Sequence, residues 1–340
     1  MIDCGTQVFL CDVPIRLDTY TGCSHGCEYC FATRKKDDLF KNIKPDDSLI
    51  ALKKFVKGNR KKTVNWCDWD IPLHFGGMSD PLQPLEAKHK KTYECLEYLA
   101  ETQYPFIIST KGKLLKDEKY LDILSKCNCV VQISAVCSSY DKLEPGCPTY
   151  EERLEIAKTI SPKVKRVIFR VQPYITDIKG ELIGNIPRIK EAGVYGIIVE
   201  GMKFHLKKKG LIKQGADFVY PLATLKPDFA EIRNKAHKEG LKFYSGENRT
   251  RTMGDSLCCC GIDDLEGFNG NDFNLNHLLN GDRTKPTKQM MKVGTAAPFK
   301  ALMQTAPQTP RLNKETFAGE MVNYYKANKK AMLEVFGKIE

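Results

Sequence analysis

Short apolar segments alternate with amphipathic ones along most of the chain. Around residues 49–56, 93–99, 120–124 and 153–157, apolar residues recur three and four positions apart, which is typical of helices packed on one face. The apolar segments have the length and composition of strands, and they comprise residues 13–21, 72–77, 106–110, 130–136, 167–171, 196–201 and 241–246.

The order of these segments predicts an α/β fold. Strands and helices that alternate at roughly 30-residue spacing form a parallel sheet with right-handed crossovers. Six or seven such units suit a partial, TIM-like (β/α)6 barrel better than a closed barrel of eight strands. In either form, functional sites lie at the carboxyl ends of the strands.

The character of the chain changes after Cys260. Residues 268–276 are polar and loop-like, prolines recur over residues 286–310, and residues 314–336 carry a helical pattern. We therefore expect two parts: a barrel over residues 1–261 and a mostly helical C-terminal appendage over residues 262–340.

Length and composition favour a reduced, cytoplasmic protein. The 340 residues are 42% hydrophobic, which supports a sizeable core. The N-terminus lacks the basic and apolar regions of a signal peptide, and no run approaches the ~18 apolar residues of a membrane span. Fourteen cysteines in such a chain favour metal chemistry over a disulfide scaffold. The net charge of +11 favours an anionic partner, although it also serves solubility.

Three of the cysteines lie close together directly after the first predicted strand. Cys23, Cys27 and Cys30 have the spacing C-x3-C-x2-C, with glycines that let the backbone turn tightly. Converging thiolates select zinc or an iron–sulfur cluster. A structural zinc site needs a fourth ligand, either His25 or a distant residue, whereas a cubane cluster on three cysteines leaves one iron open for a cofactor.

Several motifs together resemble the radical S-adenosylmethionine (SAM) superfamily, and more narrowly its spore photoproduct lyase-like branch. The cluster loop of that branch is matched by residues 21–32. The later motifs come in the same order over residues 13–260, and they are residues 75–86, 109–112, 132–134 and 144–154.

The resemblance implies a [4Fe-4S] cluster on Cys23, Cys27 and Cys30, with SAM bound to the open iron. One-electron cleavage of SAM would give a 5′-deoxyadenosyl radical that takes a hydrogen atom from the substrate, and the cofactor carries this chemistry. The residues that the resemblance places around SAM are Tyr29, Phe31, Gly76, Gly77, Ser79, Asp80, Lys111 and Ser134.

One position departs from the branch. The lyases that name it carry a cysteine two residues before their Ser-Asp pair, and this cysteine quenches a substrate radical; Gly77 stands there instead, which argues against the repair reaction itself. The candidates for a replacement hydrogen donor are Cys137, Cys258, Cys259 and Cys260. The last three, with Cys4 or Cys11, are also candidates for an auxiliary cluster, although we favour structural cysteines.

The sequence thus predicts a radical SAM enzyme that acts on an anionic substrate, such as a nucleotide or a base in DNA or RNA, by lyase, rearrangement or modification chemistry. Arg249 and Arg251 are candidates for binding its phosphate or carboxylate. The expected reductant is flavodoxin or ferredoxin. The alternatives are a radical SAM enzyme for a small metabolite or peptide, and a non-catalytic, zinc-stabilised nucleic-acid-binding protein.

Overall fold

The computed structural model describes residues 2–4, 11–34, 38–60, 64, 69–214, 217–271, 274 and 276–277. Most of the expected C-terminal appendage, including its predicted helix over residues 314–336, lies outside the described residues. Within them, no helix is long and apolar enough to cross a membrane.

The centre of the molecule is an eight-stranded sheet in the order β1-β2-β5-β6-β7-β8-β9-β12. Every neighbouring pair is parallel except β1, which pairs antiparallel to β2 at the edge. The strands are β1 (Ile2–Cys4), β2 (Ile15–Leu17), β5 (Leu73–Phe75), β6 (Phe106–Thr110), β7 (Cys129–Ser134), β8 (Arg166–Tyr174), β9 (Gly196–Gly201) and β12 (Lys242–Ser245). The predicted parallel, open barrel is confirmed.

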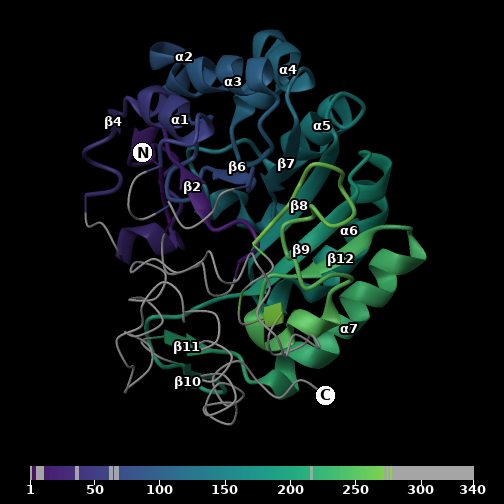
Figure 1. The fold of residues 1–340 in the computed structure, drawn as a ribbon. Helices are drawn as coiled ribbons and strands as arrows, with labels where there is room; N and C mark the ends of the chain where they lie inside the picture. Colours follow the sequence, from purple (N-terminus) through teal and green to yellow (C-terminus); the bar gives the residue numbers. More distant parts are fainter. Residues whose placement is uncertain are drawn as a thin grey trace, which may run out of the picture.

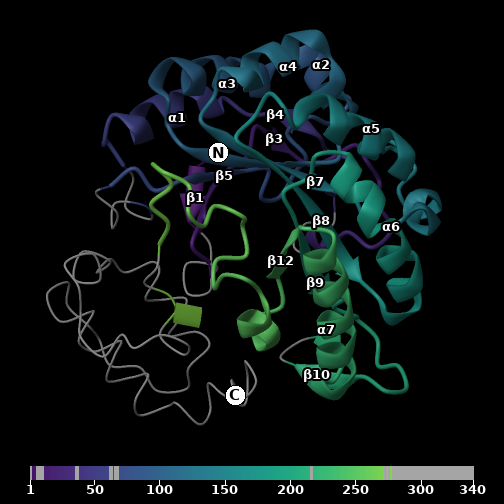
Figure 2. The ribbon, with the colours of Figure 1, turned by 90° about the vertical axis from the view of Figure 1, so that its right-hand side faces the viewer.

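In the part of the chain that the structure describes, seven α-helices cover the outer side of this curved sheet (Figures 1 and 2). They are α1 (Ser48–Val56), α2 (Glu86–His89), α3 (Lys91–Thr102), α4 (Glu118–Ser125), α5 (Tyr150–Ile160), α6 (Lys179–Glu191) and α7 (Leu222–Lys238). Two small ribbons complete the fold, β3 (Tyr20–Thr21) with β4 (Lys44–Pro45) and β10 (Ile212–Gln214) with β11 (Asp217–Val219).

Alternation along the strands creates two cores, because successive side chains point to opposite faces of a sheet. The larger core lies between the sheet and the helices and includes Phe75, Ile108 and Phe169. A smaller one covers the concave face, where Ile107 and Ile168 meet Cys258, Cys260 and other residues that come after β12. Figure 2 shows this yellow-green segment on the inner side of the sheet.

Candidate functional site

The predicted motifs meet at one edge of the sheet. The cysteine loop comes after β2 and β3, and the other motifs come after β5, β6 and β7. These strands are adjacent and parallel, so their carboxyl ends lie side by side. This is the edge at which barrels of this kind place their functional groups.

The cysteine loop owes its shape to glycine and to a buried glutamine. Gly22 and Gly26 have φ of +112° and +67°, in the left-handed region that favours glycine. Gln83, with no exposed surface, accepts from the N–H of Ser24 at 2.8 Å and donates to the carbonyl of Gly22 at 3.1 Å. A polar residue in a strand-end loop gives no sign of this role in the sequence, because the contact spans about 60 residues.

A fourth cysteine lies beside the loop. The sulfur of Cys147 is 3.7 Å from that of Cys27, although the two are 120 residues apart. This hydrogen bond, with the nearby cation of Lys111, lowers the pKa of Cys27 to about 7, whereas burial raises the pKa of Cys23 to about 12 and that of Cys30 above its usual value. The structure therefore places a thiolate-prone cysteine at the middle of the motif.

The donor set of the loop suits a soft metal or a cluster. Within the part of the chain that the structure describes, no three His, Cys, Asp or Glu side chains are already grouped to hold a metal ion. Cys23, Cys27 and Cys30 are nevertheless free thiols from one tight loop, and the first and last are both close enough to Cys27 to be influenced by its charge. Thiolates of this kind are the ligands of iron–sulfur clusters and of zinc.

A buried ion pair joins the loop to the strand ends. His25 Nε2 lies 3.1 Å from Asp80 Oδ2, and the histidine's other ring nitrogen lies 2.8 Å from the carbonyl of Gly146. Asp80 also accepts from the hydroxyl of Thr110 at 2.6 Å and the N–H of Lys111 at 2.6 Å. Burial lowers the pKa of His25, but Asp80 outweighs this and holds it above its usual value. Asp80 thus braces three of the motifs.

The other predicted SAM contacts are held by neighbouring protein groups. Ser79 is 5% exposed, and its hydroxyl donates to the carbonyl of Tyr20 at 2.8 Å. Lys111 lies 3.7 Å from buried Glu144, which also accepts from the hydroxyl of Tyr29. The carbonyl of Ser134, the end of β7, accepts from Arg153 at 3.1 Å, and Phe31 is 49% exposed beside the loop. Ser79, Lys111 and Ser134 lie at or just beyond the carboxyl ends of the adjacent strands β5, β6 and β7.

Two glycines of the second motif have no room for a side chain. At Gly76, with φ of +90°, a Cβ atom would lie 2.5 Å from the carbonyl oxygen of Ser109. At Gly77 it would lie 2.3 Å from Cδ of Arg16. Gly76 therefore needs glycine, because its neighbour is backbone, whereas a side chain at position 77 would require Arg16 to move.

The candidate hydrogen donors divide between the two faces of the sheet. Cys137 is 1% exposed in the core beneath the helices, where burial raises its pKa to about 12. Cys258, Cys259 and Cys260 lie on the concave face, and Cys260 forms side-chain hydrogen bonds with the other two and with Cys11. The structure thus brings the second group, and not Cys137, to the inner side of the barrel.

The candidate substrate arginines differ in their partners. Arg249 is tied by Nε to Glu247 at 2.9 Å and by Nη1 to the carbonyl of Tyr220 at 2.9 Å. Arg251 bonds Asn248 through Nη2 at 2.6 Å and lies beside the sulfur of Cys259. The charge of Arg249 is therefore internally neutralised, while Arg251 faces the cysteine cluster.

A histidine on the concave face provides a pH test of this arrangement. His74 lies 2.8 Å from the hydroxyl of Ser109, and burial together with Arg170 and Arg16 lowers its pKa to about 3. Only the unfolded chain takes up this proton between pH 6.5 and 3, so stability is lost as the pH falls through that window. We expect native His74 to add a loss of about 1–2 kcal/mol between pH 6.5 and 5, which His74→Gln removes.

Urea unfolding at both pH values measures this difference. His89→Gln, on helix α2 of the outer layer, is the matched control and should keep the parent's pH dependence. Equal pH slopes for the parent and His74→Gln would show that His74 is not held neutral by its surroundings.

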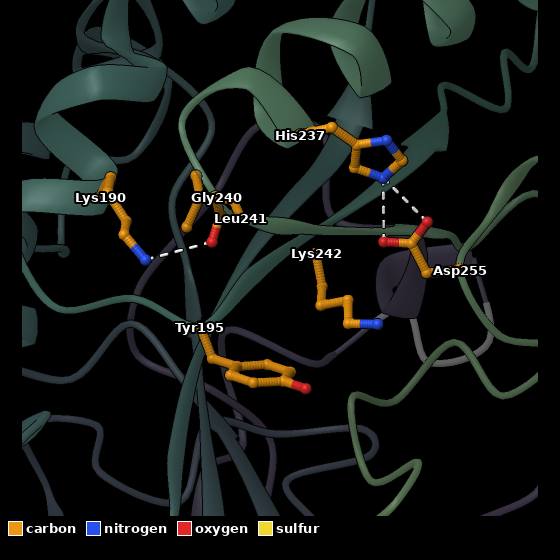
Figure 3. Close-up of a pocket in the computed structure, with 7 residues that line it drawn as sticks. All are labelled: Lys190, Tyr195, His237, Gly240, Leu241, Lys242 and Asp255. Carbon is orange, nitrogen blue, oxygen red and sulfur yellow. Dashed lines mark hydrogen bonds and ion pairs between the residues drawn. The ribbon is translucent and has the colours of Figure 1, made fainter.

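A separate hollow lies at the other end of the barrel, where the strands have their amino ends (Figure 3). Its volume is ≈ 620 Å³, and its lining includes Tyr195 and Lys242, which adjoin the amino ends of β9 and β12. His237 and Asp255 pair across it at 2.9 Å. The amino-terminal face of such barrels serves stability more than catalysis, so this hollow is not the centre of the predicted chemistry.

Comparison with known proteins supports the fold and leaves the function open. No protein-family model matches the chain. The uncharacterized protein Rv2578c of Mycobacterium tuberculosis (strain ATCC 25618 / H37Rv) is 25% identical over 242 residues, covering 67% of this chain and 69% of the relative. The uncharacterized protein Mb2609c of Mycobacterium bovis matches with the same identity and coverage.

Among solved structures, the chain has the fold of spore photoproduct lyase. The lyase complexed with dinucleoside spore photoproduct superposes with a TM-score of 0.56 at 16% identity, covering 68% of this chain and 77% of the lyase. A double mutant of the lyase with bound AdoMet and the same dinucleoside gives a TM-score of 0.56 at 16% identity, covering 68% of this chain and 76% of the lyase. The partial barrel predicted from the order of strands and helices is therefore confirmed.

Proposed function

We propose that this protein is a radical SAM enzyme. The observation that carries the proposal is the position of the three-cysteine loop, at the carboxyl end of β2 beside the motifs that come after β5, β6 and β7, in a fold shared with an AdoMet-binding lyase. Cys23, Cys27 and Cys30 would hold a [4Fe-4S] cluster, and Ser79, Lys111 and Ser134 would contact SAM. When bound, this pair supplies a radical that abstracts a hydrogen atom from the substrate.

The chain's own residues prepare the site. Gln83 and the His25–Asp80 pair fix the loop against the strand ends, so the thiols are presented from a rigid support. Lys111 directly follows β6 and lies 3.7 Å from Glu144, and its cation would meet the carboxylate of SAM. Tyr29 packs against Tyr140 with ring centroids 5.6 Å apart and ring planes tilted by 58°, and it would shield the cluster from water.

The net charge of +11 supports an anionic substrate, with a nucleotide or a nucleic-acid base as our proposal. Gly77 leaves the repair reaction of the lyase without its usual hydrogen donor, so we propose a different product, with Cys258, Cys259 or Cys260 available as a donor. The experiment is anaerobic reconstitution: the enzyme should hold about four irons per chain and release 5′-deoxyadenosine with SAM and dithionite. Zinc without iron would contradict the proposal.

The position of Cys147 supports a zinc site as an alternative to the cluster. Because Cys147 lies beside Cys27, it could join the three loop cysteines as the fourth thiol of a structural zinc site, which would fit a zinc-stabilised binding protein without catalysis. A radical SAM enzyme for a small metabolite or peptide would have the same cluster site. The identity of the bound metal therefore distinguishes radical SAM enzymes from the non-catalytic zinc protein, but it does not distinguish between substrates.

The variant Cys147→Ala distinguishes cluster from zinc. On a three-cysteine cluster, the Cys147 thiol donates a hydrogen bond to a ligand sulfur, and its removal should lower the reduction potential by roughly 20–65 mV while iron stays bound. At a zinc site the same change removes a ligand, and zinc content should fall. Potentiometric titration measures the reduction potential, and metal analysis measures the iron and zinc content. An unchanged potential with full iron content would show that Cys147 does not contact the cluster.

A further inference from the structure

The concave face of the barrel is polar at its carboxyl half. Arg16, His74, Ser109, Gln132 and Arg170 alternate with residues of the outer core on β2, β5, β6, β7 and β8, so they project inward. Ser109 and Gln132 are register partners on adjacent strands. The apolar half of this face is covered by Cys258, Cys260, Ile262 and Phe268, which leaves the polar half toward the proposed SAM site.

A chain of hydrogen bonds fixes these inward side chains. Ser109 donates to Gln132 Oε1 at 2.8 Å, and Arg170 Nη1 donates to the same oxygen at 3.0 Å. Arg170 Nε donates to Gln172 at 2.9 Å, and Gln172 donates to Glu200 at 2.7 Å. Arg170 is thereby held in place by neutral amides, which orient its guanidinium group without neutralising its charge.

Two carboxylates near this face have cations of their own: Glu200 pairs with Lys203 at 2.9 Å, and Glu247 pairs with Arg249 at 2.9 Å. Arg16 lies near the carboxylate of Asp18, and Arg251 lies near the carboxylate of Asp12. The guanidinium group of Arg170 is instead hydrogen-bonded by neutral amides. The nearby thiol of Cys259 has its pKa lowered to about 6, by a hydrogen bond from Cys260 and then by Arg251 and Arg170, so the local field is positive.

Some buried nitrogens of these arginines are donors that a bound anion could satisfy, although Arg251 also interacts with the sulfur of Cys259. Arg251 is 4% exposed, yet its Nε and Nη1 have no hydrogen-bond partner among the oxygen and nitrogen atoms of the described chain, and neither does the buried Nε of Arg16. Leaving buried charged donors unsatisfied is costly, so sites of this kind are usually completed by a ligand. Forked guanidinium groups match the oxygens of phosphate.

We propose that the concave face binds a phosphate group of the substrate through Arg170 and Arg251, with Arg16 adding positive charge at the side of the proposed SAM site. This inference rests on the proposed function, since it concerns the substrate of the same barrel. It assigns the substrate to phosphate-bearing molecules and places the phosphate below the cluster loop, on the inner wall of the sheet. Three guanidinium groups suit a phosphate dianion better than a single carboxylate.

Titration calorimetry of the iron-loaded, SAM-bound protein with inorganic pyrophosphate tests this site. Binding should be saturable. Arg170→Gln should weaken it by about tenfold or more, because a charge-assisted pair of hydrogen bonds is lost. Arg251→Lys keeps the buried cation, so it preserves the fold better than a neutral residue would, and it should weaken binding several-fold through loss of the fork. Arg188→Gln, on the outer surface in an exposed pair with Glu151, should bind like the parent.

Failure to bind pyrophosphate, or equal affinity of the parent and all variants for pyrophosphate, would contradict the proposed phosphate site. Malonate that binds as tightly as pyrophosphate would overturn the assignment to phosphate. Release of 5′-deoxyadenosine is measured on the same preparations. SAM cleavage without pyrophosphate binding contradicts only this inference, whereas pyrophosphate binding without SAM cleavage supports the site and contradicts the proposed function.

Discussion

Cys27→Ala is expected to abolish both iron binding and SAM cleavage. Cys27 is the middle ligand of the proposed cluster and the thiol of the motif whose pKa is lowered, to about 7, so it is the residue best prepared to bind as thiolate. With only two cysteines left in the loop, the cluster loses its third ligand. Reconstituted protein should fall from about four irons per chain to nearly none, with loss of visible absorption and of 5′-deoxyadenosine.

The control is another buried cysteine changed in the same way. Cys127 is 7% exposed two residues beyond the end of α4, far along the chain from the loop, and in the described structure its thiol hydrogen-bonds only to carbonyl groups. Cys127→Ala should keep its iron and its cleavage activity. A Cys27→Ala protein that retained a full cluster and cleaved SAM would refute the ligand assignment.

Glu86→Gln is expected to produce the largest loss of stability. Glu86 is completely buried, and its carboxylate accepts from the hydroxyls of Tyr20 and Tyr120 and from the N–H groups of Thr92 and Tyr93. The two N–H groups belong to the first turn of α3, where a carboxylate also complements the helix dipole. An amide leaves buried donors facing its NH₂ group, at a cost of about 3–5 kcal/mol.

Urea unfolding of the parent and the variant measures this cost. Glu94→Gln is the matched control, since Glu94 lies on the same helix in a partly exposed pair with Lys91, and such pairs contribute about 0–1 kcal/mol. A Glu86→Gln protein as stable as the parent would show that the four donors find other partners.

The strands could be predicted because each one shows as an apolar pattern over a few consecutive residues. The segments over residues 106–110 and 196–201 coincide with β6 and β9, and the other predicted strands overlap the observed ones. The amphipathic segments correspond to α1, α3, α4 and α5. By contrast, α6 and α7 each contain a proline, Pro187 and Pro227, which interrupts a helical pattern in the sequence. The edge strand β1 is too short to produce a pattern.

The cysteine loop was predictable from spacing, but its supports were not. Gln83, Glu86 and Cys147 act across 59, 66 and 120 residues in their contacts with the loop and its approach strand. Buried polar residues look like surface residues in a sequence, and only tertiary structure shows which of them are enclosed. The same holds for the arginines of the concave face, whose inward direction depends on strand register.

The contact between Gly77 and Arg16 constrains how this protein could acquire the lyase-type donor. A cysteine at position 77 would place its Cβ inside the side chain of Arg16, 2.3 Å from Cδ and 2.7 Å from Cγ. The two positions are therefore coupled, and Gly77→Cys alone is a poor starting point for engineering. Gly77→Cys would require Arg16 to change its rotamer or to be shortened, and either change displaces one of the three guanidinium groups on the inner wall. A cysteine donor at position 77 and the present position of the Arg16 guanidinium group therefore exclude each other, and this chain has the guanidinium group.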